Sequence, residues 1–326
     1  MNFIIITGQT ATGKTKLAIQ MAKKYNGEII NCDSRQVYKK LDIITGKDIK
    51  KNSKFKSQSS KLNFDIGYYP LSSKIYYLKS KIWLYDIVDP KQRFSSYDWT
   101  QCTLYLIKKL LKQKITPIIV GGSYFYLKHL LYGFDYEVPP NFKLREKLDN
   151  KSVKELQKIL KGINVQSFNQ LNNSDKNNPR RLIRKIEISK CFRKEARIPV
   201  LNDLGGAQPD FSRGSTPSGV KNTVSSFLLI GLKYKDKNKL RQAIKTRVEK
   251  RLKQGAIEEV KSLLKKGYKK TDPGLKTIGY QQIISYLEGK VNKEEAIKQW
   301  ITAEVQYAKR QLTFMKKDKN IQWKEI

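Results

Sequence analysis

The segment that decides the fold is Phe3-Ile4-Ile5-Ile6-Thr7, followed by Gly8-Gln9-Thr10-Ala11-Thr12-Gly13-Lys14-Thr15. Its continuous apolar run is typical of a strand buried on both faces of a parallel sheet. The second part matches the pattern G-x-x-x-x-G-K-[ST], and apolar residues at helical spacing follow it up to Tyr25. A strand, a glycine loop and a helix in this order predict a phosphate-binding loop at the end of the first strand.

Each part of this loop has a physical reason to hold phosphate. Glycines let the backbone curl so that its N–H groups converge on phosphate oxygens, and the following helix adds its dipole. Lys14 supplies a positive charge, and the Thr15 hydroxyl is a candidate ligand for Mg²⁺, the expected cofactor. We therefore predict that a diphosphate or triphosphate is bound by Gly8, Gln9, Thr10, Ala11, Thr12, Gly13, Lys14 and Thr15.

Apolar runs and helical stripes alternate after this loop. Strands are expected at residues 28–32, 81–88 and 115–120, and helices at residues 98–112 and 123–131. Strands that alternate with helices imply βαβ units and a parallel sheet, to which residues 227–232 are expected to return as a further strand. The predicted class is α/β, with a P-loop-type parallel sheet core flanked by helices and a helical insertion domain.

The insertion is indicated by a change of pattern at Val138. Residues 142–161 and 179–192 look helical, with no strand signal between them. Residues 237–266, 281–287 and 293–316 are expected to be helices with basic faces, whereas polar residues 50–61 and 203–223 are expected to be loops. We divide the chain into a P-loop core (1–137), a helical insertion (138–184), and a core continuation with basic C-terminal helices (185–326).

The charge of the chain indicates a polyanionic partner. Lys and Arg number 66 against 29 Asp and Glu, a formal net charge of +37, which favours nucleic acid, although a lysine-rich composition alone would give a similar excess. Three widely spaced cysteines and one histidine offer no zinc-ligand spacing or disulfide framework, which fits a reducing cytoplasm. No apolar stretch approaches the roughly 20 residues of a membrane helix. A soluble monomer is the default expectation.

Two further polar stretches directly follow predicted strands. Asp33-Ser34-Arg35-Gln36 comes after residues 28–32, and Gly121-Gly122-Ser123 comes after residues 115–120. The carboxyl ends of parallel strands share the edge of the sheet where open α/β folds bind ligands. Helix capping by Asp33 or Ser34, and a cap with a tight turn at Gly121-Gly122-Ser123, explain the same residues, so the pattern alone leaves both interpretations open. Residues 82–86 end in Asp86, where a plain buried strand is favoured over a Mg²⁺ ligand.

Seven segments in register carry a resemblance to a known family. They are the glycine loop, D-S-R-Q-V-Y (33–38), D-I-V-D-P (86–90), G-G-S-x-x-Y-L (121–127), N-P-R-R-L-I-R (178–184), I-G-Y (278–280) and Y-A-K-R-Q-x-T (307–313). The series resembles the tRNA dimethylallyltransferase family over nearly the whole chain. Departures from its pattern include Gln9 where proline is usual, Ser123 where threonine is usual, Gln282 for glutamate and Phe314 for tryptophan.

The resemblance implies a reaction and roles for residues. Dimethylallyl diphosphate would occupy the glycine loop in place of ATP, and the acceptor would be the N6 amine of the adenosine 3′ to the anticodon in tRNA. Asp33 would be the general base or hydrogen-bond acceptor for that amine, Ser123 would help to stabilise the transition state, and Lys14 would hold the leaving diphosphate. Contacts with the anticodon stem-loop are implied for Asp33, Ser34, Arg35, Gln36, Ser123, Arg145, Arg180, Arg181, Leu182, Ile183, Arg184, Gly279 and Tyr280.

Three alternative functions compete with this one. An adenylate dimethylallyltransferase acting on free AMP, ADP or ATP would share the loop and Asp33, and a P-loop nucleotide kinase would also fit both. A non-catalytic basic RNA-binding protein would leave the intact Lys14 and Thr15 unexplained. The helical insertion and the basic C-terminal helices favour the polymeric acceptor.

Overall fold

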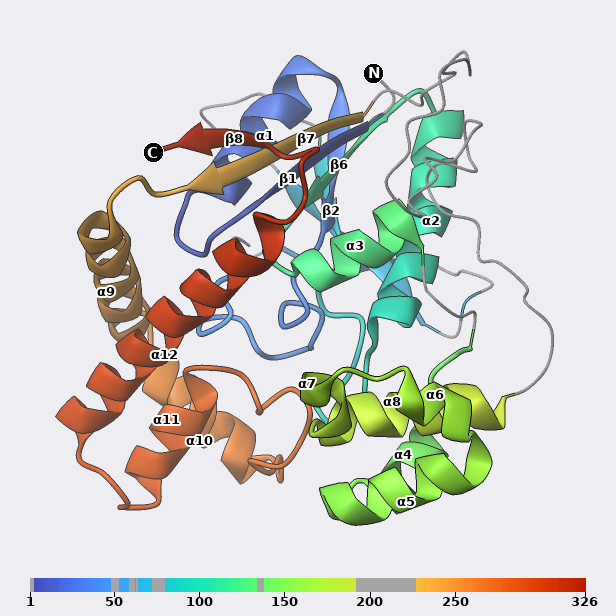
Figure 1. Cartoon of the computed structure of the whole chain (residues 1–326). Coiled ribbons are helices and arrows are strands. Elements are labelled where there is room, and N and C mark those ends of the chain that lie inside the picture. The colour runs from blue at the N-terminus through green and yellow to red at the C-terminus, as the bar shows by residue number, and fades with distance from the viewer. Residues whose placement is uncertain are drawn as a thin grey trace. The chain divides into compact units, whose positions relative to one another are not determined.

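The computed structural model describes residues 3–47, 53–58, 62, 64–71, 80–133, 138–191 and 227–326. The chain divides into two compact units (Figure 1). One is a core unit of residues 1–131 and 201–326, and the other is a helical unit of residues 132–200.

An eight-stranded sheet forms the centre of the core unit, in the order β3-β4-β5-β2-β6-β1-β7-β8. Six strands run parallel, whereas β3 and β4 pair antiparallel at one edge. The α/β class expected from the sequence is confirmed. The strands are β1 (Phe3–Gly8), β2 (Gly27–Asn31), β3 (Lys56–Gln58), β4 (Ile66–Leu71), β5 (Ser80–Trp83), β6 (Thr116–Val120), β7 (Phe227–Lys233) and β8 (Gln322–Glu325).

The first strand is central because its side chains are apolar on both faces. Ile4, Ile5 and Ile6 are fully buried, and β1 pairs with β6 on one side and β7 on the other. Small residues of the next helix, Ala18 and Ala22, pack into the same core cluster. The helices of the unit are α1 (Lys14–Lys24), α2 (Ser96–Lys112), α3 (Tyr124–Tyr132), α9 (Lys237–Lys253), α10 (Ala256–Lys265), α11 (Tyr280–Leu287) and α12 (Lys293–Met315).

Several predicted boundaries were wrong for local reasons. The strand expected at residues 81–88 ends at Trp83, because Leu84 and Asp86 adopt positive φ angles of 65° and 56°. The helix expected at residues 237–266 is broken at Gly255, whose φ of 98° ends one helix and starts the next. Residues 56–58, expected in a loop, form β3, and β4 and β8 were missed. The loop expected at residues 203–223 lies outside the described residues.

The described part of the helical unit consists of short helices with capped starts. The predicted helix at residues 142–161 is interrupted, because Ser152 and Glu155 form a capping box that starts α5. Leu156, Leu160 and Leu182 are fully buried in its core. The helices are α4 (Phe142–Leu148), α5 (Val153–Ile163), α6 (Val165–Asn169), α7 (Asn173–Lys176) and α8 (Pro179–Lys190). Because α8 continues to Lys190, the insertion extends past the predicted limit at Arg184.

No helix within the described residues combines the length and the apolar composition needed to cross a membrane.

Candidate active site

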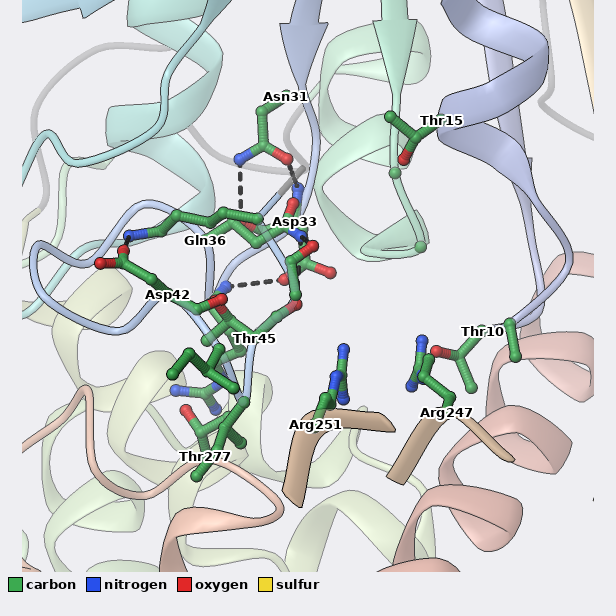
Figure 2. Close-up of a pocket in the computed structure, with 18 of the residues that line it drawn as sticks. Thr10, Thr15, Asn31, Asp33, Gln36, Asp42, Thr45, Arg247, Arg251 and Thr277 are labelled. Atoms are coloured by element: carbon green, nitrogen blue, oxygen red, sulfur yellow. Dashed lines mark hydrogen bonds and ion pairs between the residues drawn. The ribbon is translucent and has the colours of Figure 1, made fainter. Parts of the chain in front are cut away.

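A cavity of about 1800 Å³ opens at the carboxyl ends of the central strands of the core unit (Figure 2). It is formed by the glycine loop after β1, the segment after β2, the segment after β6, and side chains of α9 and α12. The parallel arrangement explains this convergence, since equivalent strand ends meet at one edge. Its lining includes Thr10, Gly13, Lys14, Thr15, Asp33, Gln36, Gly122, Arg247, Arg251, Tyr307 and Arg310.

The glycine loop has a backbone that demands glycine at its two ends. A Cβ at Gly8 would lie 2.1 Å from the carbonyl oxygen of Leu232, so β7 approaches more closely than any side chain allows. Gly13 has a φ of 75° directly before α1, a conformation that costs glycine little. The Thr12 hydroxyl and the Lys14 ammonium donate to the carbonyl oxygen of Gln9 at 2.7 and 2.6 Å. The loop is thereby closed on itself with Lys14 and Thr15 lining the cavity.

Two glutamine side chains tie this loop to distant segments. Gln9 donates through Nε2 to the carbonyl of Ala308 at 3.4 Å and accepts from the backbone N–H of Tyr234 at 3.1 Å. The backbone N–H of Gln9 donates to the carbonyl oxygen of Leu232, a hydrogen bond that proline at this position could not form. Gln311 accepts from the N–H of Thr10 and donates to the carbonyl of Gly122, both at 2.9 Å. The sequence indicated only a basic helix face around Gln311, because this bridge joins segments far apart in the chain.

The segment after β2 is held to the segment after β6. Asp33 accepts through Oδ1 from the N–H of Arg35 at 2.8 Å, and its own N–H donates to Asn31 Oδ1 at 3.0 Å (Figure 2). The Ser123 hydroxyl oxygen accepts from the N–H of Ser34 at 2.9 Å. Asp33 therefore starts a turn instead of capping a helix, and Ser123 braces that turn. A Cβ at Gly121 would lie 1.9 Å from the carbonyl oxygen of Cys32, so glycine is required there.

Ionisable groups in the cavity influence one another. Burial, then the positive charge of Arg247, lowers the pKa of Lys14 to about 8, and the negative charge of Asp33 acts in the opposite direction. Burial, then the charge of Asp33, raises the pKa of Tyr307, which stays a neutral phenol. An anionic ligand would favour protonated Lys14 over neutral Lys14.

Two arginines that the sequence did not single out complete the positive lining. Arg247 and Arg251 are four residues apart on α9 and point into the cavity that Thr10 and Asp33 line (Figure 2). Both form ion pairs with Glu304 of α12. Their spacing on one helix face was a usable signal, but only the tertiary structure shows which basic residues face the site.

The carboxylate of Asp86 is hydrogen-bonded to two side chains of the core unit. It accepts from the Lys47 ammonium and from the Tyr69 hydroxyl, and its residue is buried. Lys47 also donates to the carbonyl of Tyr38 and to Asp42, both at 2.7 Å. Asp86 is therefore buried as expected, but it follows the end of β5 and does not lie in a strand; its contacts brace the loop that carries Asp33.

Part of the I-G-Y segment, for which tRNA contact was predicted, is buried in the core unit. The Tyr280 side chain is fully buried, and its hydroxyl donates to Glu259. A Cβ at Gly279 would lie 2.5 Å from Ile44, so glycine there permits close packing. Glu259 also accepts from the N–H groups of Asp42, Ile43 and Ile44. The side chain of Tyr280 supports the loop after β2 and offers no exposed surface to RNA.

The helical unit uses two of its predicted RNA-contacting arginines internally. The buried carboxylate of Glu187 accepts two hydrogen bonds from Arg145, at 2.7 and 3.0 Å, and another from Arg184. Leu182 and Ile183 are buried in the core of this unit. By contrast, the side chains of Arg180 and Arg181 lie on its surface, where Arg181 pairs with Asp175.

Together, the glycine loop, the adjacent carboxylate and the positive lining define a P-loop α/β enzyme that acts on a phosphorylated substrate. Comparison with known proteins narrows this class. The sequence model described as IPP transferase matches residues 76–318, and the model described as Isopentenyl transferase matches residues 1–59. The chain belongs to the IPP transferase family.

Curated relatives and solved structures agree with this assignment. The tRNA dimethylallyltransferase of Thermoanaerobacter sp. (strain X514) is 32% identical over 330 residues, covering 99% of this chain and 91% of the relative. That of Anoxybacillus flavithermus is 33% identical over 321 residues, covering 98% and 89%. The tRNA isopentenylpyrophosphate transferase structure from Bacillus halodurans has a TM-score of 0.62 at 26% identity, covering 100% of this chain and 90% of that one.

Proposed function

We propose that this chain transfers the dimethylallyl group of dimethylallyl diphosphate to the N6 amine of the adenosine 3′ to the anticodon in tRNA. The observation that carries the proposal is that Lys14 and Thr15 of the glycine loop line the same cavity as Asp33, in a member of this family. We take tRNA as the acceptor because the relatives of this chain are tRNA dimethylallyltransferases. That the chain acts as a monomer in the cytoplasm stays a prediction from the sequence.

The diphosphate is proposed to bind in the glycine loop. Its oxygens would accept from the backbone N–H groups and from Lys14, and Arg247 faces the same cavity. These groups stabilise the negative charge that grows on the leaving diphosphate, which lowers the barrier to breaking the allylic C–O bond. The electron pair of that bond leaves with the diphosphate.

Mg²⁺ fits the oxygen donors at this place. The Thr15 hydroxyl lines the cavity beside the loop, and Mg²⁺ prefers oxygen ligands and commonly keeps waters and substrate phosphates. Thr15 would hold the ion, which would supply further positive charge against the diphosphate. The remaining positive charge is the chain's own, from Lys14 and the arginines of α9.

Asp33 is proposed to take the proton from the acceptor amine. The exocyclic adenine amine is a poor nucleophile because its lone pair is delocalised into the ring, so it needs a positioned acceptor. The nitrogen forms the new C–N bond as its proton passes to the Asp33 carboxylate. Oδ1 is already held by the N–H of Arg35, and this hydrogen bond fixes the orientation of the group. Ser123 keeps the turn in place through Ser34.

The adenosine must leave its stack in the anticodon loop to reach this cavity. Flipping a base costs a few kcal/mol, and contacts of basic residues with the phosphate backbone can offset that cost. Surface residues Arg180 and Arg181 of the helical unit remain candidates for such contacts. The net charge of +37 supports a polyanionic acceptor over a free nucleotide.

A labelling experiment tests the proposed function. The protein is incubated with labelled dimethylallyl diphosphate and Mg²⁺, with unmodified tRNA in one reaction and AMP in another. Label in tRNA, at the adenosine 3′ to the anticodon, is the expected result. Label in AMP alone would reverse the choice of acceptor. ATP turnover in a third reaction, without label in tRNA or AMP, would favour a kinase. Lys14→Met removes the charge that is proposed to hold the diphosphate, so it is expected to lose labelling of tRNA. Lys24→Met, a change at an exposed position at the end of α1, is its matched control.

A further inference from the structure

A buried carboxylate lies behind the arginines of the candidate active site. Glu304 of α12 is 5% exposed and accepts hydrogen bonds from three side chains. Trp300, one turn earlier on the same helix, donates its indole N–H at 3.0 Å. Arg251 donates to the same oxygen at 3.1 Å, and Arg247 donates to the other oxygen. Each carboxylate oxygen is therefore committed, and the orientation of the group is fixed.

The charges of this cluster depend on one another. Burial alone would raise the pKa of Glu304, but the positive charges of Arg247 and Arg251 outweigh it, so the pKa is lowered. Burial, then the charge of Arg247, lowers the pKa of Arg251 to about 10. Two guanidinium groups four residues apart on one helix repel each other, and both face a cavity that already contains Lys14. Glu304 reduces this repulsion while keeping a net positive charge on the cluster.

The two arginines differ in their remaining contacts. A Cβ at Gly46 would lie 2.4 Å from Nη2 of Arg251, so this guanidinium packs directly on the loop that follows Asp33. Arg251 lines the cavity but is only 7% exposed, so it forms part of the cavity wall. Arg247 is more open, with 28% of its side chain exposed, and its buried Nε has no hydrogen-bond partner within the described parts of the chain. The exposed part of the Arg247 side chain, and not its buried Nε, is what an acceptor in the cavity can reach.

We propose that Glu304 is a positioning residue for the diphosphate site, which holds Arg247 at the cavity while Arg251 serves as the second anchor of the carboxylate. This inference rests on the proposed function in taking the isoprenoid diphosphate as the ligand. Glu304 also lines the cavity, but both of its oxygens are hydrogen-bonded to Trp300 and the two arginines, and a carboxylate would repel a diphosphate. Glu304 acts through Arg247, and it leaves the proton acceptor Asp33 in place.

The experiment compares diphosphate binding with turnover. Affinity for inorganic diphosphate with Mg²⁺ is measured by calorimetry, and kcat and KM for dimethylallyl diphosphate are measured with tRNA. The variants are Glu304→Gln, Arg247→Met and the double variant. Glu294→Gln, at an exposed position in the first turn of the same helix, is the matched control. Thermal unfolding of each variant identifies any loss of fold.

Glu304→Gln is expected to weaken diphosphate binding by about 10- to 100-fold, the scale of one hydrogen bond to a charged group, with a matching rise in KM and little change in kcat. In the Arg247→Met background it is expected to have no further effect, because residues that act through one another are non-additive. Equal affinities for Glu304→Gln and Glu294→Gln would overturn the inference. A full additional loss in the Arg247→Met background would also overturn it, because Glu304 would then act independently of Arg247.

A second variant covers the case in which Glu304→Gln does not fold. Glu304→Asp keeps the charge but withdraws it by one methylene, so a smaller loss of diphosphate affinity is expected, and unchanged affinity would refute the positioning role. If the unaltered chain binds diphosphate but does not prenylate tRNA, the proposed function fails while the comparison of variants still decides the role of Glu304. If the unaltered chain binds no diphosphate, both fail.

Discussion

The cavity of the core unit and the surface of the helical unit both carry arginines, but these arginines are held in different ways. In the core unit, Arg247 and Arg251 come from one helix and their counter-ion Glu304 comes from another, so tertiary packing presents them to the cavity. In the helical unit, Arg145 and Arg184 form ion pairs with the buried carboxylate of Glu187. All four arginines are paired with a buried glutamate, so the place of that glutamate in the fold decides where their guanidinium groups lie.

The largest effect on turnover is expected at Asp33, the residue of the core unit that is proposed to take the proton from the acceptor amine. Asp33→Asn keeps the size of the side chain but removes the proton acceptor, so kcat is expected to fall by about 10²- to 10⁴-fold. Affinity for tRNA is expected to stay near that of the unaltered chain, because replacing one carboxylate by a neutral amide leaves the Lys and Arg side chains unchanged. Single-turnover transfer and a filter-binding assay measure the two quantities. An equal loss of tRNA affinity would make Asp33 a contact and not a base.

The next largest effect distinguishes a structural arginine from an exposed one. Arg145→Met removes one of the two arginine partners of the buried Glu187 and is expected to destabilise the protein by about 1–3 kcal/mol. Arg180→Met, at an exposed position on α8, is expected to change stability by less than about 0.5 kcal/mol. Urea unfolding followed by circular dichroism compares the two variants. Equal stabilities would contradict the internal role assigned to Arg145.

A pH effect is expected from Lys14. Its pKa of about 8 in the free protein is below its unfolded value, so folding releases its proton between about pH 8 and 10.5, and the stability it contributes rises with pH in that window. Diphosphate binding needs the protonated form, so affinity is expected to fall as pH rises above about 8, by up to about tenfold per pH unit. Calorimetry with a dimethylallyl diphosphate analogue measures this.

The control for that titration is Lys14→Arg, whose guanidinium stays charged throughout. Its affinity is expected to show no such fall above about pH 8. The same pH dependence in both proteins would assign the titration to another group. In Arg247→Met, the loss of affinity for the dimethylallyl diphosphate analogue is expected to begin at a higher pH, because the charge of Arg247 helps to lower the pKa of Lys14.

The smallest effect concerns the surface of the helical unit. Affinity for tRNA is expected to fall steeply with salt through counterion release. Arg180→Met and Arg181→Met are each expected to reduce the slope of log affinity against log salt by about one. Unchanged slopes would remove these two residues from the RNA-binding surface.

Much of the fold could be predicted because the signals were local. The strand from Phe3, the glycine loop and the helix from Lys14 were found from apolar spacing and one motif, and α12 was placed to within a residue. Strand β4 was missed, and residues 84–88 were assigned to a strand. The positive φ at Asp86 accompanies contacts with Lys47 and Tyr69, which come from separate parts of the chain and leave no local pattern.

The glycine loop and the class of fold could be read from the sequence, because the pattern of each strand, loop or helix lies within about a dozen consecutive residues. The sequence also placed Asp33 and Ser123 at the ends of strands that share an edge. The bridge that Gln311 makes between two loops and the ion pairs of Glu304 with two arginines could be found only in the folded chain. A hydrogen bond or ion pair depends on distance in space, and each of these pairs is at least 53 positions apart in the sequence.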